Sequence, residues 1–224
     1  MDRSEIYVPS RRLFLASAAF LSTMYTVKGA FADELAKTPK STEGPFYPNK
    51  LPLDTDNDLI RINEEITPAF GEVTHLTGKV LDVKGNPVRN ALVEIWQCDG
   101  KGVYLHTADS DKKKDQQDKH FQGFGRFATS AKGEYYFRTI KPVPYPGRTP
   151  HIHVKVKKNG KELLCTQCYI NGHEGNAKDG IYKSISDPKQ IANVSLDFTK
   201  MKDSKLGELT ANFDIVLGIT PELD

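Results

Sequence analysis

Residues 74–97, THLTGKVLDVKGNPVRNALVEIWQ, contain the pattern that decides the fold. Residue types that favour strands fill Thr74–Val83 and Ala91–Gln97, and Lys84-Gly85-Asn86-Pro87 between them is a turn sequence. Apolar side chains fall on both faces of the second run, which is typical of a strand inside a domain core. We therefore predict two strands joined by a tight turn.

Further short strands follow along the chain, separated by turns and polar loops. They are predicted at Gly133–Thr139, His151–Lys157, Leu163–Ile170, Val194–Phe198 and Leu209–Leu217. Residues 99–132 predict polar loops, including a charged run at 109–119 that we expect to be solvated. Because no long helical pattern occurs, the sequence predicts an all-β fold, an antiparallel β-sandwich with long loops.

The first 32 residues have the form of an export signal. Arg11 and Arg12 precede an apolar run at 13–25, and Ala30-Phe31-Ala32 offers a small-residue cleavage site. The paired arginines resemble a twin-arginine signal, so we expect a periplasmic or secreted protein. An N-terminal anchor helix is the alternative, but polar residues interrupt the apolar run and argue against a stable membrane anchor.

Beyond residues 1–32, we expect an extended arm at 33–72 and a β-sandwich domain at 73–224. Lys and Arg number 31 against 29 Asp and Glu, so charge gives no reason to expect nucleic acid or an anionic membrane as a partner. After residue 40, no apolar run is long enough to span a bilayer.

The chain has three cysteines, Cys98, Cys165 and Cys168. An odd number in an exported protein leaves a free thiol or a bridge to another chain. Cys165 and Cys168 lie in one predicted strand and face opposite sides of it, out of disulfide reach. A bridge from Cys98 to one of them stays open, and we assign none of the three to a metal.

His151-Ile152-His153 is the sharpest local feature. Alternate residues of a strand share a face, so both imidazoles project to the same side, with backbones about 6 to 7 Å apart. Two imidazoles at that spacing could bind one metal ion. Pairs of histidines at this spacing also occur on exposed strands.

Two tyrosines could complete such a site. Tyr145 lies between prolines in Lys141–Pro150, where four prolines predict an irregular connection with little backbone freedom. Tyr104 follows a glycine-rich loop after the second predicted strand. Two phenolates with two imidazoles favour Fe(III) over Zn(II) or Cu(I). The chain has 9 tyrosines, so composition alone does not select these two.

An ordered set of motifs resembles the intradiol ring-cleavage dioxygenases, most closely their protocatechuate 3,4-dioxygenase branch. The motifs are Thr42-Glu43-Gly44-Pro45-Phe46-Tyr47, Ile95-Trp96-Gln97 with Tyr104, Gly125-Arg126, Tyr135-Tyr136-Phe137-Arg138-Thr139-Ile140-Lys141-Pro142, Pro144-Tyr145-Pro146, Arg148 with His151-Ile152-His153, and Thr166-Gln167. The resemblance runs from residue 42 to residue 172 and more loosely to the end.

The resemblance implies a non-haem Fe(III) held by Tyr104, Tyr145, His151 and His153. It also implies that Tyr145 takes up a substrate proton, while Arg148 and Gln167 stabilise charge that develops on the ring. The implied reaction opens a catechol-type ring (catechol, protocatechuate or hydroxyquinol) with O₂ to a cis,cis-muconate-type diacid.

The chain departs from that branch in two ways. The branch has a tryptophan after the Pro-Tyr-Pro step, and Gly147 stands there in this chain, so we expect a more open pocket. The branch also pairs two different chains. No second chain is visible in this sequence, which is compatible with a homo-oligomer.

Two other functions fit part of the sequence. The strand–turn–strand pattern at 78–94 also occurs in noncatalytic, transthyretin-like binding modules, which would not need the four metal ligands. The same fold could instead hold Cu or Zn for hydrolysis. A visible charge-transfer band from tyrosinate on Fe(III) would separate the dioxygenase from both alternatives.

Overall fold

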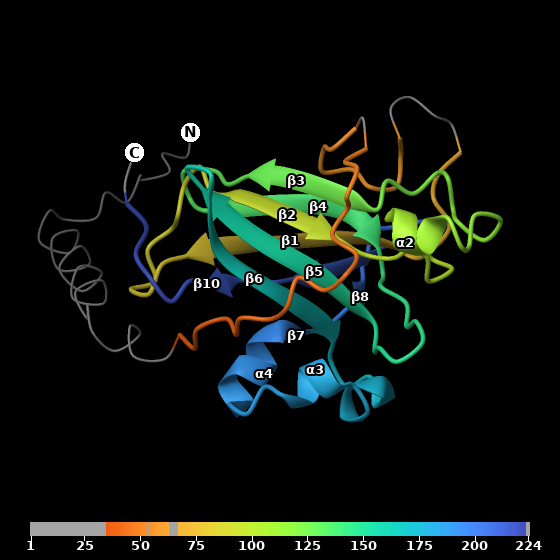
Figure 1. Ribbon diagram of the computed structural model, residues 1–224. Helices are drawn as coiled ribbons and strands as arrows, with labels where there is room; N and C mark the ends of the chain where they lie inside the picture. The colour runs from red at the N-terminus through yellow and green to blue at the C-terminus, as the bar shows by residue number, and fades with distance from the viewer. Residues whose placement is uncertain (1–34, 53, 63–66, 223–224) are drawn as a thin grey trace, which may run out of the picture. The chain divides into compact units, whose positions relative to one another are not determined.

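The computed structural model describes residues 35–52, 54–62 and 67–222, so the predicted export signal at 1–32 lies outside the described residues. Two five-stranded sheets form the body of this part of the chain (Figure 1). The first sheet contains β1 (Val73–Leu81), β4 (Glu134–Ile140), β8 (Thr199–Lys200), β9 (Leu209–Asn212) and β10 (Ile215–Val216). The second runs in the order β3 (Phe124–Ala128), β2 (Leu92–Trp96), β5 (His151–Lys158), β6 (Lys161–Ile170) and β7 (Ser195–Leu196).

The predicted all-β sandwich is confirmed, with sheets that are mixed in direction. The long pairings β1 with β4, β2 with β5 and β5 with β6 are antiparallel. Three short pairings, β1 with β9, β1 with β10 and β6 with β7, are parallel. The parallel partners of β1 all come from the C-terminal part of the chain, which returns to the first sheet after the helical connection.

Strand β3 and four short helical segments were not predicted from the sequence. β3 lies inside 99–132, a range that we expected to be loop, and it pairs with all five residues of β2. The helical segments are α2 (Thr107–Ser110), η1 (Glu174–Ala177), α3 (Gly180–Lys183) and α4 (Pro188–Val194). α4 takes Val194 from the predicted strand 194–198, so only β7 remains of that strand. Four to seven residues are too few to give a helical period in sequence.

Strand β5 is buried on both faces over most of its length. Its even-numbered residues Ile152, Val154 and Val156 belong to the main hydrophobic core. Its odd-numbered residues begin with His151 and His153 and face the other way, because side chains alternate along a strand. We call the side of the second sheet that carries these two histidines the outer face.

The N-terminal arm covers this outer face. Ser41 donates its backbone N–H to the carbonyl of Cys165, and the amide of Gln167 donates to the carbonyl of Thr42. Glu43 pairs with the ammonium group of Lys155, whose side chain is 6% exposed. The two histidines are therefore enclosed between the sheet and a segment that lies more than 100 residues earlier in the chain.

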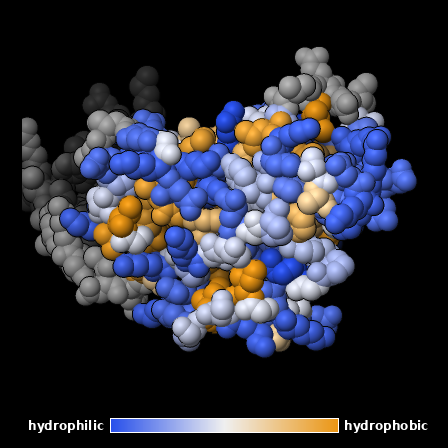
Figure 2. All heavy atoms as spheres, in the orientation of Figure 1, coloured by the Kyte–Doolittle hydropathy of each residue, from blue (hydrophilic) through white to orange (hydrophobic). Residues whose placement is uncertain are grey.

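The surface in Figure 2 is mostly hydrophilic, and its hydrophobic side chains form small separate patches. Exposed large hydrophobic residues such as Phe70 and Leu206 are far apart in the chain. Scattered apolar residues are normal on protein surfaces and do not by themselves indicate a docking site. Among the described residues, no helix has the length and apolar character needed to cross a membrane.

Candidate active site

The six residues singled out from the sequence lie together on the outer face of the second sheet. β5 contributes His151 and His153, and the adjacent β6 contributes Gln167 directly opposite His153. Tyr104 comes from the loop after β2, and the proline-rich loop before β5 carries Tyr145 and Arg148. Two loops and two strands thus meet at one place.

Potential metal-binding atoms converge there. Nε2 of His151 lies 3.2 Å from Nε2 of His153 and 3.3 Å from the hydroxyl of Tyr104. The ring of Tyr145 lies edge-on to that of Tyr104, with ring centroids 5.5 Å apart. Among the described residues, no group of three or more His, Cys, Asp or Glu could hold a metal ion. A metal site in this part of the chain would therefore need the tyrosines.

The two histidines are buried and neutral. Burial, and after it the charge of Arg148, lower the pKa of His151 to about 4. Burial, His151 and Arg148 together hold the pKa of His153 well below its usual value. His153 also stacks on Trp96, with ring centroids 4.8 Å apart and planes 9° from parallel.

The tautomer of His151 follows from its hydrogen bond. Its Nδ1 lies 2.6 Å from the carbonyl oxygen of Thr149, and a carbonyl can only accept. Nδ1 therefore carries the ring proton, and Nε2 presents an unshared electron pair to the converging atoms. Metal-bound histidines usually have this arrangement, with the other ring nitrogen donating to a carbonyl or carboxylate.

Tyr104 is held by two buried aspartates. Asp99 accepts hydrogen bonds from the backbone N–H groups of Lys101 and Val103, which shapes the loop before Tyr104. Asp109 accepts the backbone N–H of Tyr104 itself at 2.9 Å. The expectation of a solvated charged run at 109–119 is therefore wrong for Asp109, which is buried because it closes this loop, and for Asp118, which is buried where it accepts the backbone N–H of Phe70.

Tyr145 and Arg148 are the two ends of a tight turn. The backbone N–H of Arg148 donates to the carbonyl of Tyr145 at 2.9 Å. Gly147 inside the turn has φ +82°, which suits glycine, and a Cβ atom there would meet nothing within 4 Å. The wall beside Tyr145 is therefore open at Gly147.

Arg148 links the tyrosine to the glutamine. Its guanidinium donates from NH2 to Oε1 of Gln167 at 2.6 Å and from NH1 to the hydroxyl of Tyr145 at 3.4 Å. Its Nε donates to Oδ2 of Asp179 at 2.8 Å. Asp179 was not predicted from the sequence. In the sequence it shows only the signal of a helix N-cap, an Asp before a short helix, and nothing that connects it to Arg148.

Among the described residues, all three cysteines are free buried thiols, so the bridge from Cys98 that the sequence left open is not formed. Cys98 donates weakly to the carbonyl of Val143, and burial followed by Asp99 raises the pKa of its thiol to about 12. Cys165 lies with the aromatic residues of the outer face, while Cys168 lies in the main core. Their opposite orientation within one strand is as predicted.

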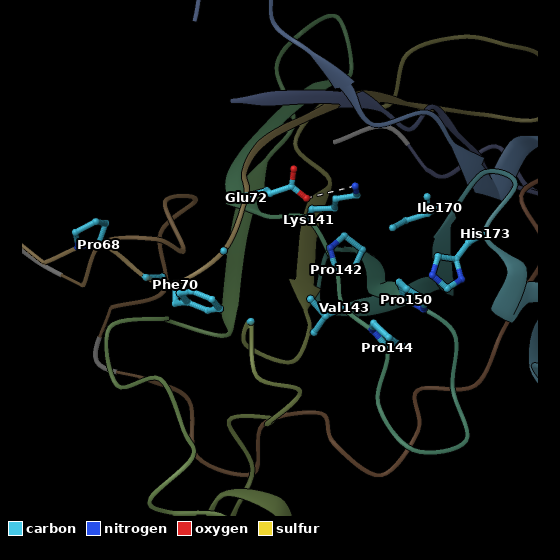
Figure 3. Close-up of a pocket in the computed structure, with 13 residues that line it drawn as sticks. Pro68, Phe70, Glu72, Lys141, Pro142, Val143, Pro144, Pro150, Ile170 and His173 are labelled. Carbon is cyan, nitrogen blue, oxygen red and sulfur yellow. Dashed lines mark ion pairs between the residues drawn. The ribbon is translucent and has the colours of Figure 1, made fainter. Parts of the chain in front are cut away.

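Another cavity lies beside the proline-rich loop (Figure 3). It measures about 800 Å³, and Phe70, Pro142, Pro144 and Ile170 contribute to its apolar walls. The Glu72–Lys141 ion pair, with 3.3 Å between charged atoms, lies at its edge. None of the six candidate residues lines this cavity. A smaller cavity of about 240 Å³ is lined by Tyr145, Gly147 and Arg148, and another of about 400 Å³ is lined by Gln167, so both border the candidate site.

Comparison with known proteins gives consistent matches. Residues 42–218 match a protein family described as "Dioxygenase". The protocatechuate 3,4-dioxygenase beta chain of Burkholderia cepacia is 37% identical over 174 residues, which are 72% of this chain and 71% of that protein. Hydroxyquinol 1,2-dioxygenase of Corynebacterium glutamicum is 29% identical over 206 residues. That match covers 80% of this chain but only 63% of the relative, less than two thirds of its length.

A solved structure agrees with these relatives. The dioxygenase domain of a dioxygenase and carbohydrate-binding protein fusion from Streptomyces sp. SirexAA-E has a TM-score of 0.62 and 27% identity. The match covers 83% of this chain and 100% of that one. Sequence motifs, family match and fold agree over the same region. The chain belongs to the intradiol ring-cleavage dioxygenase family.

Proposed function

We propose that the protein is a non-haem Fe(III) enzyme that opens a catechol-type ring with O₂ and produces a cis,cis-muconate-type diacid. The observation that carries this proposal is the convergence of Nε2 of His151, Nε2 of His153 and the hydroxyl of Tyr104, with the ring of Tyr145 packed edge-on against that of Tyr104. The proposed iron ligands are Tyr104, Tyr145, His151 and His153.

The protonation states fit a ferric ion. The tautomer of His151 leaves Nε2 free to bind a metal. Burial raises the pKa of Tyr104 well above its usual value and raises that of Tyr145, so neither phenol ionises there without a cation. A highly charged ion would make both groups phenolates, by the same effect that deprotonates other metal-bound donors. Hard phenolate oxygens with imidazoles favour Fe(III) over softer ions.

The surrounding residues would support the reaction in distinct ways. Bound to these ligands, ferric iron would hold a catecholate and make its ring reactive toward O₂. Tyr145 would accept a proton from a substrate hydroxyl, and the nearby Arg148 would favour the phenolate form that can accept it. Arg148 and Gln167 would stabilise negative charge that develops on the substrate.

The open turn at Gly147 bears on the choice of substrate. No side chain fills the space beside this turn, and the adjacent cavity reaches Tyr145 and Arg148. We therefore expect the site to accept catechols with a substituent on the ring. Catechol, protocatechuate and hydroxyquinol, together with catechols that carry larger groups, form the test panel.

The test is oxygen uptake by the iron-loaded protein with each catechol, followed by mass spectrometry of the product. We expect one O₂ consumed per catechol and a diacid that gains both atoms of ¹⁸O₂. Iron-free protein is the control. Absence of uptake with every catechol, or an aldehyde product from cleavage beside the two hydroxyls rather than between them, would contradict the proposal.

We also propose that the enzyme acts outside the cytoplasm. The support is the paired arginines and apolar run within residues 1–32 of the sequence. Its test is described in the Discussion.

A further inference from the structure

We propose that Asp179 is the positioning residue for Arg148. Its buried carboxylate holds the guanidinium so that the other two nitrogens point at Tyr145 and Gln167. This inference rests on the proposed function, because it concerns the orientation of Arg148, the residue proposed to stabilise charge on the substrate.

The carboxylate of Asp179 accepts four hydrogen bonds, two on each oxygen. Oδ2 accepts from Nε of Arg148 at 2.8 Å and from the backbone N–H of Thr149 at 3.0 Å. Oδ1 accepts from the backbone N–H groups of Ile181 at 2.9 Å and Tyr182 at 3.0 Å. The side chain is 0% exposed, so water does not compete for these bonds. A carboxylate with this many donors is fixed in position.

Fixing Nε of Arg148 fixes the whole guanidinium, because the group is planar and its nitrogens form a rigid fork. With Nε on Asp179, NH2 reaches Gln167 at 2.6 Å and NH1 reaches the hydroxyl of Tyr145 at 3.4 Å. Loss of the Nε partner would let the guanidinium turn about the side-chain bonds. Both other contacts depend on that one orientation.

Asp179 also holds the backbone next to the proposed ligand His151. The same Oδ2 that binds Arg148 accepts the N–H of Thr149, and the carbonyl of Thr149 accepts the ring proton of His151. The hydroxyl of Thr149 donates to the side-chain oxygen of Asn176 in η1. Thr149 is therefore held by two hydrogen bonds, one through its backbone N–H and one through its side chain. The carboxylate of Asp179 thus connects α3 to the loop that enters β5, and Asn176 connects η1 to the same loop.

Helix capping alone does not account for Asp179. Asp187 caps α4 with one oxygen, accepting from the backbone N–H of Lys189 at 2.9 Å, and it remains exposed. Asp179 needs only Oδ1 to cap α3, and its other oxygen faces Arg148 and Thr149. Burial of a charge is costly unless the charge is paired, and Arg148 supplies the pair.

The test separates the two roles of Asp179. Asp179→Ser keeps an N-cap hydroxyl for α3 but is too short and uncharged to hold Arg148. We expect kcat/KM of the iron-loaded variant to fall about 10- to 100-fold through kcat, as expected for loss of a charge-assisted hydrogen bond. Iron content should fall less than kcat, because all four proposed ligands remain. Asp187→Ser is the matched control and should keep the wild-type kcat/KM.

A double variant shows whether Asp179 acts through Arg148. Arg148→Ala should lower kcat more than iron content, and adding Asp179→Ser to it should cause no further loss. If the two losses multiply, or if Asp179→Ser keeps the wild-type kcat/KM, the positioning role is wrong.

A readout in metal-free protein keeps this inference separate from the proposed function. The Nε–H signal of Arg148 in ¹⁵N NMR should be protected from solvent exchange in the wild type and in Asp187→Ser, and should lose protection in Asp179→Ser. An unchanged signal in Asp179→Ser contradicts the inference. A wild-type enzyme that consumes no O₂ contradicts the proposed function instead.

Discussion

At the residue scale, the two candidate histidines are held by different kinds of contact. The carbonyl of Thr149 keeps the proton of His151 on Nδ1, while His153 is buried with no partner for its Nδ1 among the described residues. His153 instead stacks on Trp96. We infer that His151 is oriented by a hydrogen bond and His153 by ring packing.

Tyr104 offers the first test at this scale. Tyr104→Phe removes a proposed phenolate ligand and changes little else, since its ring stacks on Phe46 at 4.8 Å. We expect loss of most bound iron or of the visible charge-transfer band, measured by metal analysis and absorbance. Tyr136→Phe is the control, because Tyr136 contacts His75 rather than the site. Full colour in Tyr104→Phe would show that the ligand assignment is wrong.

The sequence was informative about single residues where local geometry sufficed. The shared face of His151 and His153 follows from their spacing, and the structure bears it out. Tyr104 and Tyr145 needed the family resemblance, since 9 tyrosines gave no basis for choice. Asp179 could not be found, because its contact with Arg148 spans 31 positions and depends on how the loops pack.

At the element scale, strand β5 carries both the core and the site. Its even-numbered residues fill the main hydrophobic cluster, and its odd-numbered residues face the arm. A shift of one residue in its register would exchange these two sets. The antiparallel pairings with β2 and β6 exclude that shift and set His153 opposite both Trp96 and Gln167.

The turn between β1 and β2 is held by Asp82. Its Oδ1 accepts the backbone N–H groups of Lys84 and Asn86, and its Oδ2 accepts from Asn86 Nδ2 and Thr220. Burial raises the pKa of this carboxyl, but the hydrogen bonds outweigh burial and hold it below the ordinary 3.8. The charged form is therefore the one that stabilises the fold.

Asp82→Asn should lower the free energy of unfolding by about 1 to 3 kcal/mol at neutral pH. The variant replaces one carboxylate oxygen by an N–H₂ group, which cannot accept the two hydrogen bonds that this oxygen accepts in the wild type. A depressed pKa contributes stability above the unfolded-state pKa, near 3.9. That contribution is lost as the pH falls through the folded-state pKa. The difference between wild type and variant should thus shrink below about pH 4, measured by urea unfolding.

Asp203→Asn, in an exposed turn, is the control for Asp82→Asn and should change stability little at any pH. A difference for Asp82→Asn that stays constant down to acid pH would show that charge is not the cause.

Strand β3 shows where local pattern fails. Its sequence, Phe-Gly-Arg-Phe-Ala, is short and includes a glycine and a charge. A Cβ on Gly125 would lie 2.5 Å from Leu59 and 2.6 Å from the carbonyl oxygen of Asp56. The glycine therefore serves close packing of the arm on the strand. A partner so distant in the chain leaves no local signal.

At the scale of the whole molecule, the site exists because distant segments meet on one sheet. Gln167 in β6 reaches the carbonyl of Thr42 in the arm, and Lys155 in β5 pairs with Glu43. Tyr47, farther along the arm, donates to Glu94 and packs edge-on against Trp96. The arm therefore shields the outer face from water, which strengthens electrostatic interactions at the histidines.

Export is a prediction for the whole chain. A fusion of residues 1–35 to a folded reporter should leave the cytoplasm, because the paired arginines resemble a signal read by a route that carries folded proteins. Replacing Arg11 and Arg12 by lysine keeps the charge and should stop export, measured by cell fractionation. Export of the doubly substituted fusion at the wild-type level would contradict a twin-arginine signal.

The sequence by itself determined the all-β class, most strand positions and the shared orientation of His151 and His153. These depend on the two-residue period of a strand, which is a local property. It also determined the family, because many motifs occur in one order along residues 42–172. Only the tertiary structure decided that the cysteines stay free and that Asp109 closes the loop before Tyr104. It also decided that Asp179 binds Arg148 and orients its guanidinium. Those contacts join residues through packing and burial, and no repeat along the chain encodes them.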